Sequence, residues 1–298
     1  MTRPDLSVVV PAVNTLSDVL DCLAHLDRQR TDVNLEVLLI DRLGGDFDKS
    51  VRAEHPWVRV LPAEKRHTIP EMRAIAFDSA RGRAVAVIED HVMVPEGWAR
   101  RMLSALKKSD GVVGGSVENA ATRTLLDWAC FLCEYSNLIP PIEAGDVPSL
   151  TGNNVVYEKG LLDRFRDAYR AGKWENYLHD QFKLEGVRLI CRPEIEVGHK
   201  KHYTFGEYLS QRYLYARSYA GARVAGKTLL KRLIYGLAAF ILPPLLFVRI
   251  FTGIWRKGRH RGLLVRSAPL IAFFVISWGL GEVVGYWFGD GGALAKVC

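Results

Sequence analysis

Short apolar runs alternate with amphipathic segments along residues 5–200, and this alternation restricts the fold more than any other feature of the sequence. The runs are rich in β-branched residues, and the segments between them carry apolar positions at helical spacing. The strand-like runs are LSVVVPAV, LEVLLID, VRVLPA, AVAVIED and GVVGGSV. Strands that alternate with helices form a mostly parallel sheet covered by helices on both faces, so we predict an α/β fold.

Polar residues follow several of these runs at the point where each predicted strand ends. Asn14 follows the first, Asp41 ends the second, and Glu89-Asp90-His91 ends a later one. Ligands of such sheets bind outside the carboxyl ends of the strands, so we expect these side chains to converge. Two acids suit a divalent cation, and the imidazole of His91 favours Mn²⁺ over Mg²⁺. The same three residues also fit a capped turn with solvated acids.

Composition changes near residue 225, which we take as the boundary between two domains. Residues 1–225 have the character of a soluble α/β domain, whereas residues 226–298 are apolar, glycine-rich and basic. The chain carries a net charge of +7, much of it in the C-terminal third. Basic residues beside long apolar runs fit anionic lipid headgroups better than nucleic acid. We therefore predict membrane-associated helices after the α/β domain, and no nucleic-acid partner.

Two apolar segments, about 233–254 and 267–288, lie in this C-terminal region. Pro243-Pro244 interrupts the first segment, whereas the second carries a single charge, Glu282. The flanking sequences KTLLKR and RKGRHRGLLVR are basic, which places both ends of the first segment in the cytoplasm. We therefore expect a re-entrant or interfacial hairpin bent at the prolines, followed by one transmembrane helix. Two spans joined by an exterior basic loop remain the alternative.

The N-terminus and the cysteines bear on the cellular compartment. LSVVVPAV is too short for the apolar core of a signal peptide and contains Pro11, so we expect the α/β domain on the cytoplasmic side of the cell membrane. Five cysteines at irregular spacing do not indicate a disulfide framework. Cys130 and Cys133 lie in an apolar helical pattern, which favours buried cysteines over a metal or redox pair.

Six motifs follow one another along the α/β domain: SVVVPAVN, EVLLIDRLGGD, MRAIAFDSARG, VIEDHVMVPEGW, TGNNVVYEKGLL and WENYLHDQFKLEGVRL. In their order and spacing the chain resembles the family 2 glycosyltransferases over about residues 5–200. The resemblance implies the GT-A fold, a Rossmann-like, mixed and mostly parallel sheet. It also implies a nucleotide-sugar donor and a bound Mn²⁺ or Mg²⁺.

The resemblance further implies which residues bind the donor. They are Pro11, Asn14, Asp41, Arg73, Glu89, Asp90, Asn153, Gln211 and Arg212. Asp90 and His91 would hold the metal, with Glu89 next to the ribose or the metal. Three of these residues have plainer alternatives: Asp41 as a strand-end cap, Arg73 as a surface arginine, and Arg212 as a snorkelling residue of an interfacial helix.

Inverting transfer requires a carboxylate that accepts the proton of the attacking hydroxyl. The resemblance assigns this base to Glu175, with Asp180 as the second choice. His179 lies four residues after Glu175, on the same face of the predicted helix. The alternative for Glu175 is an acid that complements the dipole at a helix N-terminus.

Several positions depart from the family pattern. Arg42 replaces a second aspartate, Ala74 replaces an asparagine, and Asn176 follows Glu175 in place of an aspartate. These changes fit a diverged subfamily or an inactive relative. We predict a membrane-anchored, metal-dependent, inverting glycosyltransferase whose acceptor is lipid-linked or a growing envelope or exopolysaccharide glycan. A nucleotidyltransferase and an inactive membrane scaffold remain alternatives.

Overall fold

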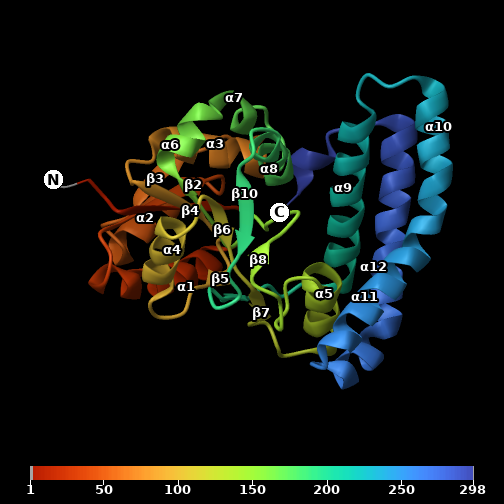
Figure 1. Cartoon of the computed structure of the whole chain (residues 1–298), viewed down its shortest axis with the longest axis horizontal. Helices are drawn as coiled ribbons and strands as arrows, with labels where there is room; N and C mark the ends of the chain where they lie inside the picture. The colour runs from red at the N-terminus through yellow and green to blue at the C-terminus, as the bar shows by residue number, and fades with distance from the viewer. Residues whose placement is uncertain (1–2, 298) are drawn as a thin grey trace. The chain divides into compact units, whose positions relative to one another are not determined.

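A mixed eight-stranded sheet forms the core of the first of two units in the computed structural model, which describes residues 3–297 (Figure 1). This unit comprises residues 1–118 and 140–200. The strand order is β3-β2-β1-β4-β9-β6-β10-β8. The strands are β1 (Leu6–Ala12), β2 (Leu35–Asp41), β3 (Arg59–Pro62), β4 (Ala84–Val87), β6 (Gly111–Gly114), β8 (Gly145–Asp146), β9 (Val155–Glu158) and β10 (Arg188–Cys191).

The pairing of these strands confirms the predicted mixed, mostly parallel α/β fold. Strands β1 to β4 pair in parallel, and so do β6 and β10. β9 runs antiparallel between β4 and β6. Every residue of β1 is buried, as expected of a strand covered on both faces.

Helices between the strands begin where the sequence supplies caps. The helices are α1 (Leu16–Asp27), α2 (Phe47–Glu54), α3 (Ile69–Ser79), α4 (Trp98–Lys107), α6 (Lys159–Arg164), α7 (Arg166–Tyr169) and α8 (Glu175–Leu184). Thr15 and Asp18 form a capping box at the start of α1, and Thr68 and Glu71 form one at the start of α3. Each box satisfies backbone N–H groups that the first helical turn leaves unpaired.

A second, three-stranded sheet was not predicted from the sequence. Its order is β5-β11-β7, with β5 at Val92–Met93, β11 at Val197–His199 and β7 at Val117–Asn119. Strands of two or three residues are too short to show an alternating pattern. β11 pairs antiparallel with β5, and this pairing sets His199 opposite Val92, directly after His91.

A buried polar network joins β1 and β2 to the turn that precedes β4. The Glu36 carboxylate accepts hydrogen bonds from Ser7 Oγ at 2.5 Å and from the Arg81 N–H at 3.0 Å, and it pairs with Arg59. Ser7 Oγ in turn accepts from the Gly82 N–H at 2.8 Å. A Cβ on Gly82 would lie 2.6 Å from the backbone nitrogen of Ser7, so only glycine fits there.

Replacing Glu36 by Ala is expected to lower the free energy of unfolding of this unit by about 3 kcal/mol, because Arg59 and Ser7 lose a shared buried partner. Denaturant titration followed by tryptophan fluorescence measures the loss. The control is Asp48→Ala, which removes an exposed ion pair with Arg52 and should cost less than about 0.5 kcal/mol. Equal effects of the two substitutions would contradict the network's role.

The second unit is helical and comprises residues 119–139 and 201–298. Its helices are α5 (Leu125–Tyr135), α9 (Phe205–Val224), α10 (Leu229–Ala238), α11 (Leu242–Lys257) and α12 (Arg261–Phe288). α12 packs against all four of the others. Glycines allow close approach: a Cβ on Gly281 would lie 2.3 Å from Tyr213 O, and one on Gly285 would lie 2.6 Å from Arg217 O. Cys130 of α5 is buried, as expected, whereas Cys133 is half-buried; both are free thiols.

The expected hairpin at Pro243-Pro244 is wrong. α10, a 3₁₀ turn at Ala239–Ile241 and α11 follow one another as a continuous helical segment, Leu229–Lys257. The prolines stand in the first turn of α11, where a missing N–H costs nothing and the fixed φ suits a helix. This segment and α12 are both long and apolar enough to span a membrane, by length and composition alone.

Candidate active site

Asp90 connects the carboxyl ends of β1 and β4. Its Oδ2 accepts hydrogen bonds from the N–H groups of Val13 at 2.8 Å and Asn14 at 2.9 Å. Its Oδ1 accepts from Asn14 Nδ2 at 2.5 Å and lies 2.9 Å from His91 Nδ1. Burial raises the pKa of Asp90, but the hydrogen bonds from His91, Val13 and Asn14 outweigh it and lower that pKa below its ordinary value. Asp90 is therefore an ionised, fully enclosed anchor for the turn.

Glu89, His91 and His199 place three potential metal ligands within 4.8 Å of one another. His91 Nε2 lies 2.9 Å from His199 Nε2, and Glu89 Oε2 lies 3.5 Å from the first and 3.8 Å from the second. Both histidines are buried, whereas Glu89 is partly exposed. Two imidazoles and one carboxylate suit a divalent transition metal such as Mn²⁺. Three protein ligands leave further coordination positions for water or a substrate oxygen.

The carboxylate of Asp90 orients His91 toward this group. When Nδ1 of His91 donates to Asp90 Oδ1, Nε2 keeps its lone pair and faces His199 and Glu89. The described residues therefore fit a metal, but with a ligand set that differs from the expected pair. Asp90 is engaged by the backbone N–H groups of Val13 and Asn14, directly after β1, and Glu89 and His199 stand beside His91 instead. Sequence reasoning missed His199, which lies 108 residues from His91 and on a three-residue strand.

Asp41 ends β2 and caps the turn that follows. Its Oδ1 accepts hydrogen bonds from the N–H groups of Leu43 at 2.8 Å and Gly44 at 2.9 Å. Asp41 is therefore a strand-end cap, the alternative role considered for it from the sequence. Its contact with a nucleotide stays a prediction. Pro11 is buried within β1.

A second polar cluster forms around Glu175, the first residue of α8. Glu175 Oε2 accepts from Arg73 Nη1 at 2.8 Å, and Oε1 accepts from the Gly152 N–H at 3.1 Å. Arg73 Nη2 also donates to Gly152 O at 3.0 Å, so Arg73 is a buried ion-pair partner rather than a surface arginine. Burial raises the pKa of Glu175, but the charge of Arg73 outweighs this and holds that pKa below its ordinary value.

The turn at residues 151–154 joins the two clusters. Asn153 Nδ2 donates to Glu89 Oε2 at 3.5 Å, while the neighbouring Gly152 contacts Arg73 and Glu175. A Cβ on Gly152 would lie 2.5 Å from Arg73 Nη1, which explains the glycine. Four residues predicted from separate motifs therefore lie in these two adjoining clusters: Arg73 and Glu175 in one, Glu89 and Asn153 in the other.

Asp180 and His179, on the same helix as Glu175, have different surroundings. Asp180 is exposed and pairs with Lys183 at 2.7 Å. His179 is buried, and its Nε2 lies 2.8 Å from the Tyr157 hydroxyl. Burial lowers the pKa of His179 to about 4, so its imidazole is neutral at physiological pH.

Gln211 and Arg212 belong to α9 in the second unit. Arg212 is buried, pairs with Glu134 at 3.2 Å and lies against the rings of Tyr208, Tyr215 and Trp278. It therefore does not snorkel from an interfacial helix. The predicted contact of Gln211 and Arg212 with a diphosphate stays a prediction.

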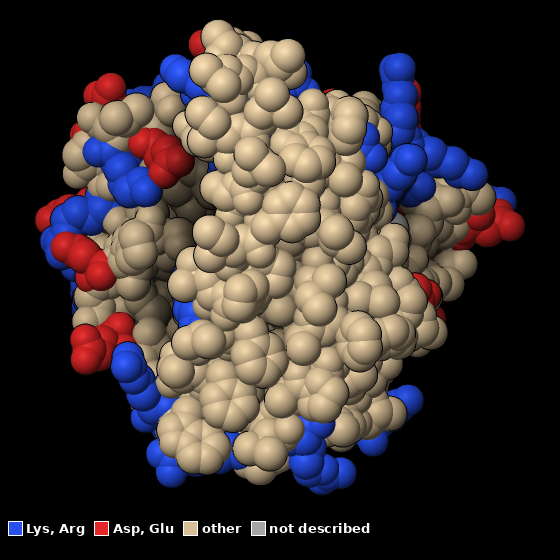
Figure 2. All heavy atoms as spheres, turned by 90° about the vertical axis from the view of Figure 1, so that its right-hand side faces the viewer, with Lys and Arg blue, Asp and Glu red and all other residues tan. Residues whose placement is uncertain are grey.

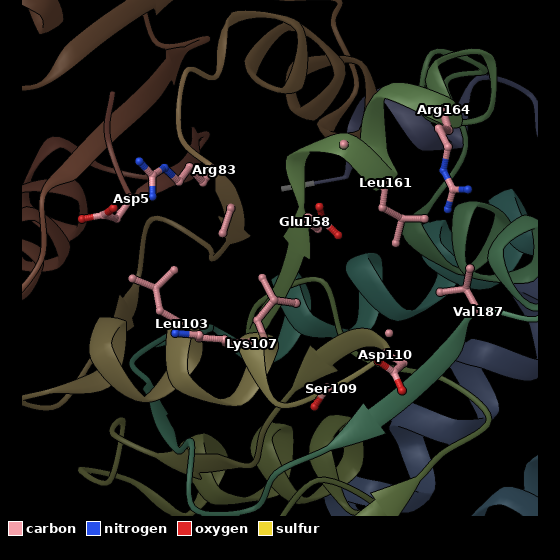
Figure 3. A pocket seen from close by; sticks show the side chains of 14 residues that line it. Asp5, Arg83, Leu103, Lys107, Ser109, Asp110, Glu158, Leu161, Arg164 and Val187 are labelled. Carbon is pink, nitrogen blue, oxygen red and sulfur yellow. The ribbon is translucent and has the colours of Figure 1, made fainter. Parts of the chain in front are cut away.

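A cavity of about 880 Å³ lies at the amino ends of β4, β6 and β10, at the opposite ends of these strands from Asp90 (Figure 3). Its charged lining is Asp5, Arg83, Lys107, Asp110, Glu158 and Arg164. Acidic and basic side chains are interspersed around it, and it contains no member of the two polar clusters.

Comparison with known proteins agrees with this fold. Residues 7–164 match the family model described as "Glycosyl transferase family 2". This match covers more than half of the chain, so the chain belongs to glycosyl transferase family 2, as the motifs predicted. A curated relative, glycosyltransferase GlyG of Streptococcus pneumoniae serotype 4, is 25% identical over 119 residues, which are 38% of this chain and 39% of that protein.

Solved structures of low sequence identity share the fold. Mannosyltransferase PcManGT from Pyrobaculum calidifontis, in complex with GDP-Man and Mn²⁺, has a TM-score of 0.51 and 17% identity over 99% of this chain and 86% of its own. S. aureus TarS 1–349 has a TM-score of 0.51 and 14% identity over 94% of this chain and 90% of its own. TarS has also been solved with UDP-GlcNAc. These neighbours confirm the predicted GT-A fold.

Proposed function

We propose that the protein is an inverting glycosyltransferase, which transfers a sugar from a nucleotide-sugar donor to an acceptor hydroxyl. The observation that carries this proposal is the junction of two clusters through the turn at 151–154. On one side stand Glu89, His91 and His199, which can hold a cation. On the other stands Glu175, an ionised carboxylate with a partly exposed side chain. Such a reaction needs a general base, and a bound cation can hold the diphosphate of the donor.

The residues around the cation site have separate tasks. Glu89, His91 and His199 would hold Mn²⁺ or Mg²⁺, with Mn²⁺ favoured by the two imidazoles. The bound ion would neutralise the charge that develops on the departing nucleoside diphosphate. Asp90 and Asn14 fix the turn that carries His91, and Asn153 positions the Glu89 carboxylate. Pro11 and Asp41 remain assigned to the nucleotide pocket.

Glu175 accepts the proton of the attacking hydroxyl, and Arg73 keeps it in the ionised form that this requires. The positive charge of Arg73 keeps Glu175 ionised, and the two hydrogen bonds from Arg73 and Gly152 fix the direction of the carboxylate. Asp180 is a weaker candidate, because its exposed pair with Lys183 gives it no fixed orientation toward either cluster.

We assign the protein to the cell membrane, with the catalytic unit on the cytoplasmic side. The apolar helices and their basic flanks support this assignment. We propose a lipid-linked acceptor or a growing envelope glycan, since a small soluble acceptor does not require a membrane-bound enzyme.

Thermal-shift measurements with a panel of nucleoside diphosphates test the proposal. A matching nucleotide is expected to raise Tm by several degrees in the presence of Mn²⁺ and much less without it, because a ligand of the folded state stabilises it. The matching sugar nucleotide should then release nucleoside diphosphate when acceptor is present. Release of pyrophosphate would indicate a nucleotidyltransferase instead, and no shift with any nucleotide would indicate an inactive scaffold.

A further inference from the structure

The helical unit has one face that is apolar and open. Figure 2 shows a broad surface without acidic or basic atoms on the side that carries α10 and α11, with Lys and Arg atoms at its margins. Large apolar side chains exposed on these helices and on α12 include Leu230, Leu237, Ile241 and Leu245 of the first helical segment and Phe273 and Leu280 of α12. We call this surface the apolar face. A continuous exposed surface of this kind indicates a binding partner that is itself apolar.

The charge of the surrounding sequence identifies that partner. Between Glu207 and Glu282 the chain contains twelve Lys and Arg residues and no Asp or Glu. Since the net charge of the whole chain is +7, the remaining residues together carry a net charge of −5. Many of these cations stand at the ends of the apolar helices: Lys227, Lys231 and Arg232 at the start of the first, and Arg256, Lys257, Arg259 and Arg261 at the turn between the two. Apolar side chains bordered by cations fit a bilayer with anionic headgroups.

The placement of these cations argues against a membrane-spanning hairpin. The segment Leu229–Lys257 is about 43 Å long, so a span would put its two basic ends on opposite sides of the membrane. Basic flanks of apolar helices tend to stay on the cytoplasmic side, so this tendency opposes moving either basic end across the membrane. The uncharged stretches are also short: 16 residues between Arg232 and Arg249, and 15 between Arg266 and Glu282. At about 1.5 Å per residue these cover roughly 24 and 22 Å of a hydrocarbon core about 30 Å thick.

The opposite side of α12 is covered by a polar helix. Arg223 of α9 donates to both carboxylate oxygens of Glu282, at 3.1 and 3.2 Å, and to the Tyr286 hydroxyl at 2.9 Å. Ser277 Oγ donates to Leu209 O at 2.7 Å, also across the α9–α12 contact. α9 itself contains Glu207, Arg217 and Arg223 and is not a candidate span. A membrane-spanning α12 would draw these charges into the hydrocarbon, where they are costly.

We propose that α10, α11 and α12 lie parallel to the membrane plane within a single leaflet, so that the chain does not cross the bilayer. The apolar face enters the acyl chains, both basic clusters contact anionic headgroups, and α9 and α5 cover the helices from the aqueous side. This arrangement keeps both basic clusters, and the Arg223–Glu282 pair, on one side of the membrane. It replaces the expected single crossing by α12, and it does not depend on the glycosyl-transfer proposal.

Cysteine accessibility tests the arrangement in intact cells that express the full chain. Single substitutions Lys227→Cys, Arg259→Cys and Asp290→Cys mark the start of the first segment, the basic turn and the end of α12; all three positions are exposed. A membrane-impermeant maleimide is added before or after lysis, and labelled peptides are identified by mass spectrometry, which separates them from the native cysteines. All three positions are expected to react only after lysis. Labelling of position 259 from outside would indicate two spans, and labelling of 290 alone would indicate one; either result overturns the proposal.

Vesicle flotation tests the apolar face and its preference for anionic lipid. The full chain is expected to bind vesicles that contain phosphatidylglycerol more tightly than phosphatidylcholine vesicles, and to lose this difference in high salt. The pair Leu237→Asn and Leu245→Asn should weaken binding by at least about tenfold. The matched control is Leu184→Asn on α8, since Leu184 is 78% exposed but lies outside the apolar face, whereas Leu237 and Leu245 are 63% and 61% exposed. Equal loss in both variants, or a discrete soluble dimer that does not float, would contradict a membrane partner.

Discussion

Glu175→Gln is expected to lower kcat of sugar transfer by about 10²–10⁴-fold while donor affinity changes little, because the amide cannot accept the acceptor proton. The amide keeps the size of the side chain and can still accept a hydrogen bond from the Gly152 N–H. Steady-state kinetics with the donor found by thermal shift, together with donor affinity from calorimetry, separate the two effects. The matched control is Asp180→Asn on the same helix, which should retain nearly full activity. The reverse ranking would move the base to Asp180.

The pH dependence adds a second readout to this test. The charge of Arg73 lowers the folded-state pKa of Glu175, so its carboxylate form persists as pH falls below the ordinary range of a glutamate. Arg73→Gln removes the neighbouring charge and should move the acidic limb of kcat toward higher pH. Other groups that titrate in this pH range are the same in the wild-type protein and in Arg73→Gln. The difference between their two pH profiles therefore reports on Glu175. An unchanged limb would argue that Glu175 is not the base.

His199→Ala is expected to weaken Mn²⁺ binding by at least about 100-fold and to abolish the Mn²⁺-dependent part of the nucleotide thermal shift. Calorimetric titration of the protein with Mn²⁺ alone measures this without any assumption about the substrate. His55→Ala, a partly exposed histidine outside the cluster, serves as the control. Asp90→Asn distinguishes the set Glu89, His91 and His199 from the pair Asp90 and His91. If the His199 variant binds Mn²⁺ normally and the Asp90 variant does not bind it, Asp90 and His91 are the metal ligands.

Local patterns were sufficient to predict most of the catalytic unit. Each strand of the parallel half was a short β-branched run, and polar residues at the strand ends, such as Asn14 and Glu89, converged as the topology requires. The resemblance to the family added Arg73 and Glu175 from motifs far apart in the chain, and the two residues form an ion pair.

The errors have physical causes that concern contacts distant in sequence. His199 reaches the cluster through pairing of strands too short to show a pattern. Glu89 and His91 belong to the group of possible metal ligands, whereas Asp90 between them accepts hydrogen bonds from the backbone of Val13 and Asn14, directly after β1. Pro243-Pro244 was taken as a bend, although prolines at a helix start are compatible with a continuous segment.

The insertion of β9 between β4 and β6 has a consequence for the order in which the sheet forms during synthesis. Strands β1 to β4 leave the ribosome early and can pair with one another, but the outer edge of β4 has no neighbour until Val155–Glu158 has been made. β6 waits for the same four residues. Open strand edges invite pairing with other chains. The nascent protein is therefore open to aggregation until β9 pairs with β4 and β6. Most of the first unit has been synthesised by then, before the apolar helices of residues 229–288 leave the ribosome.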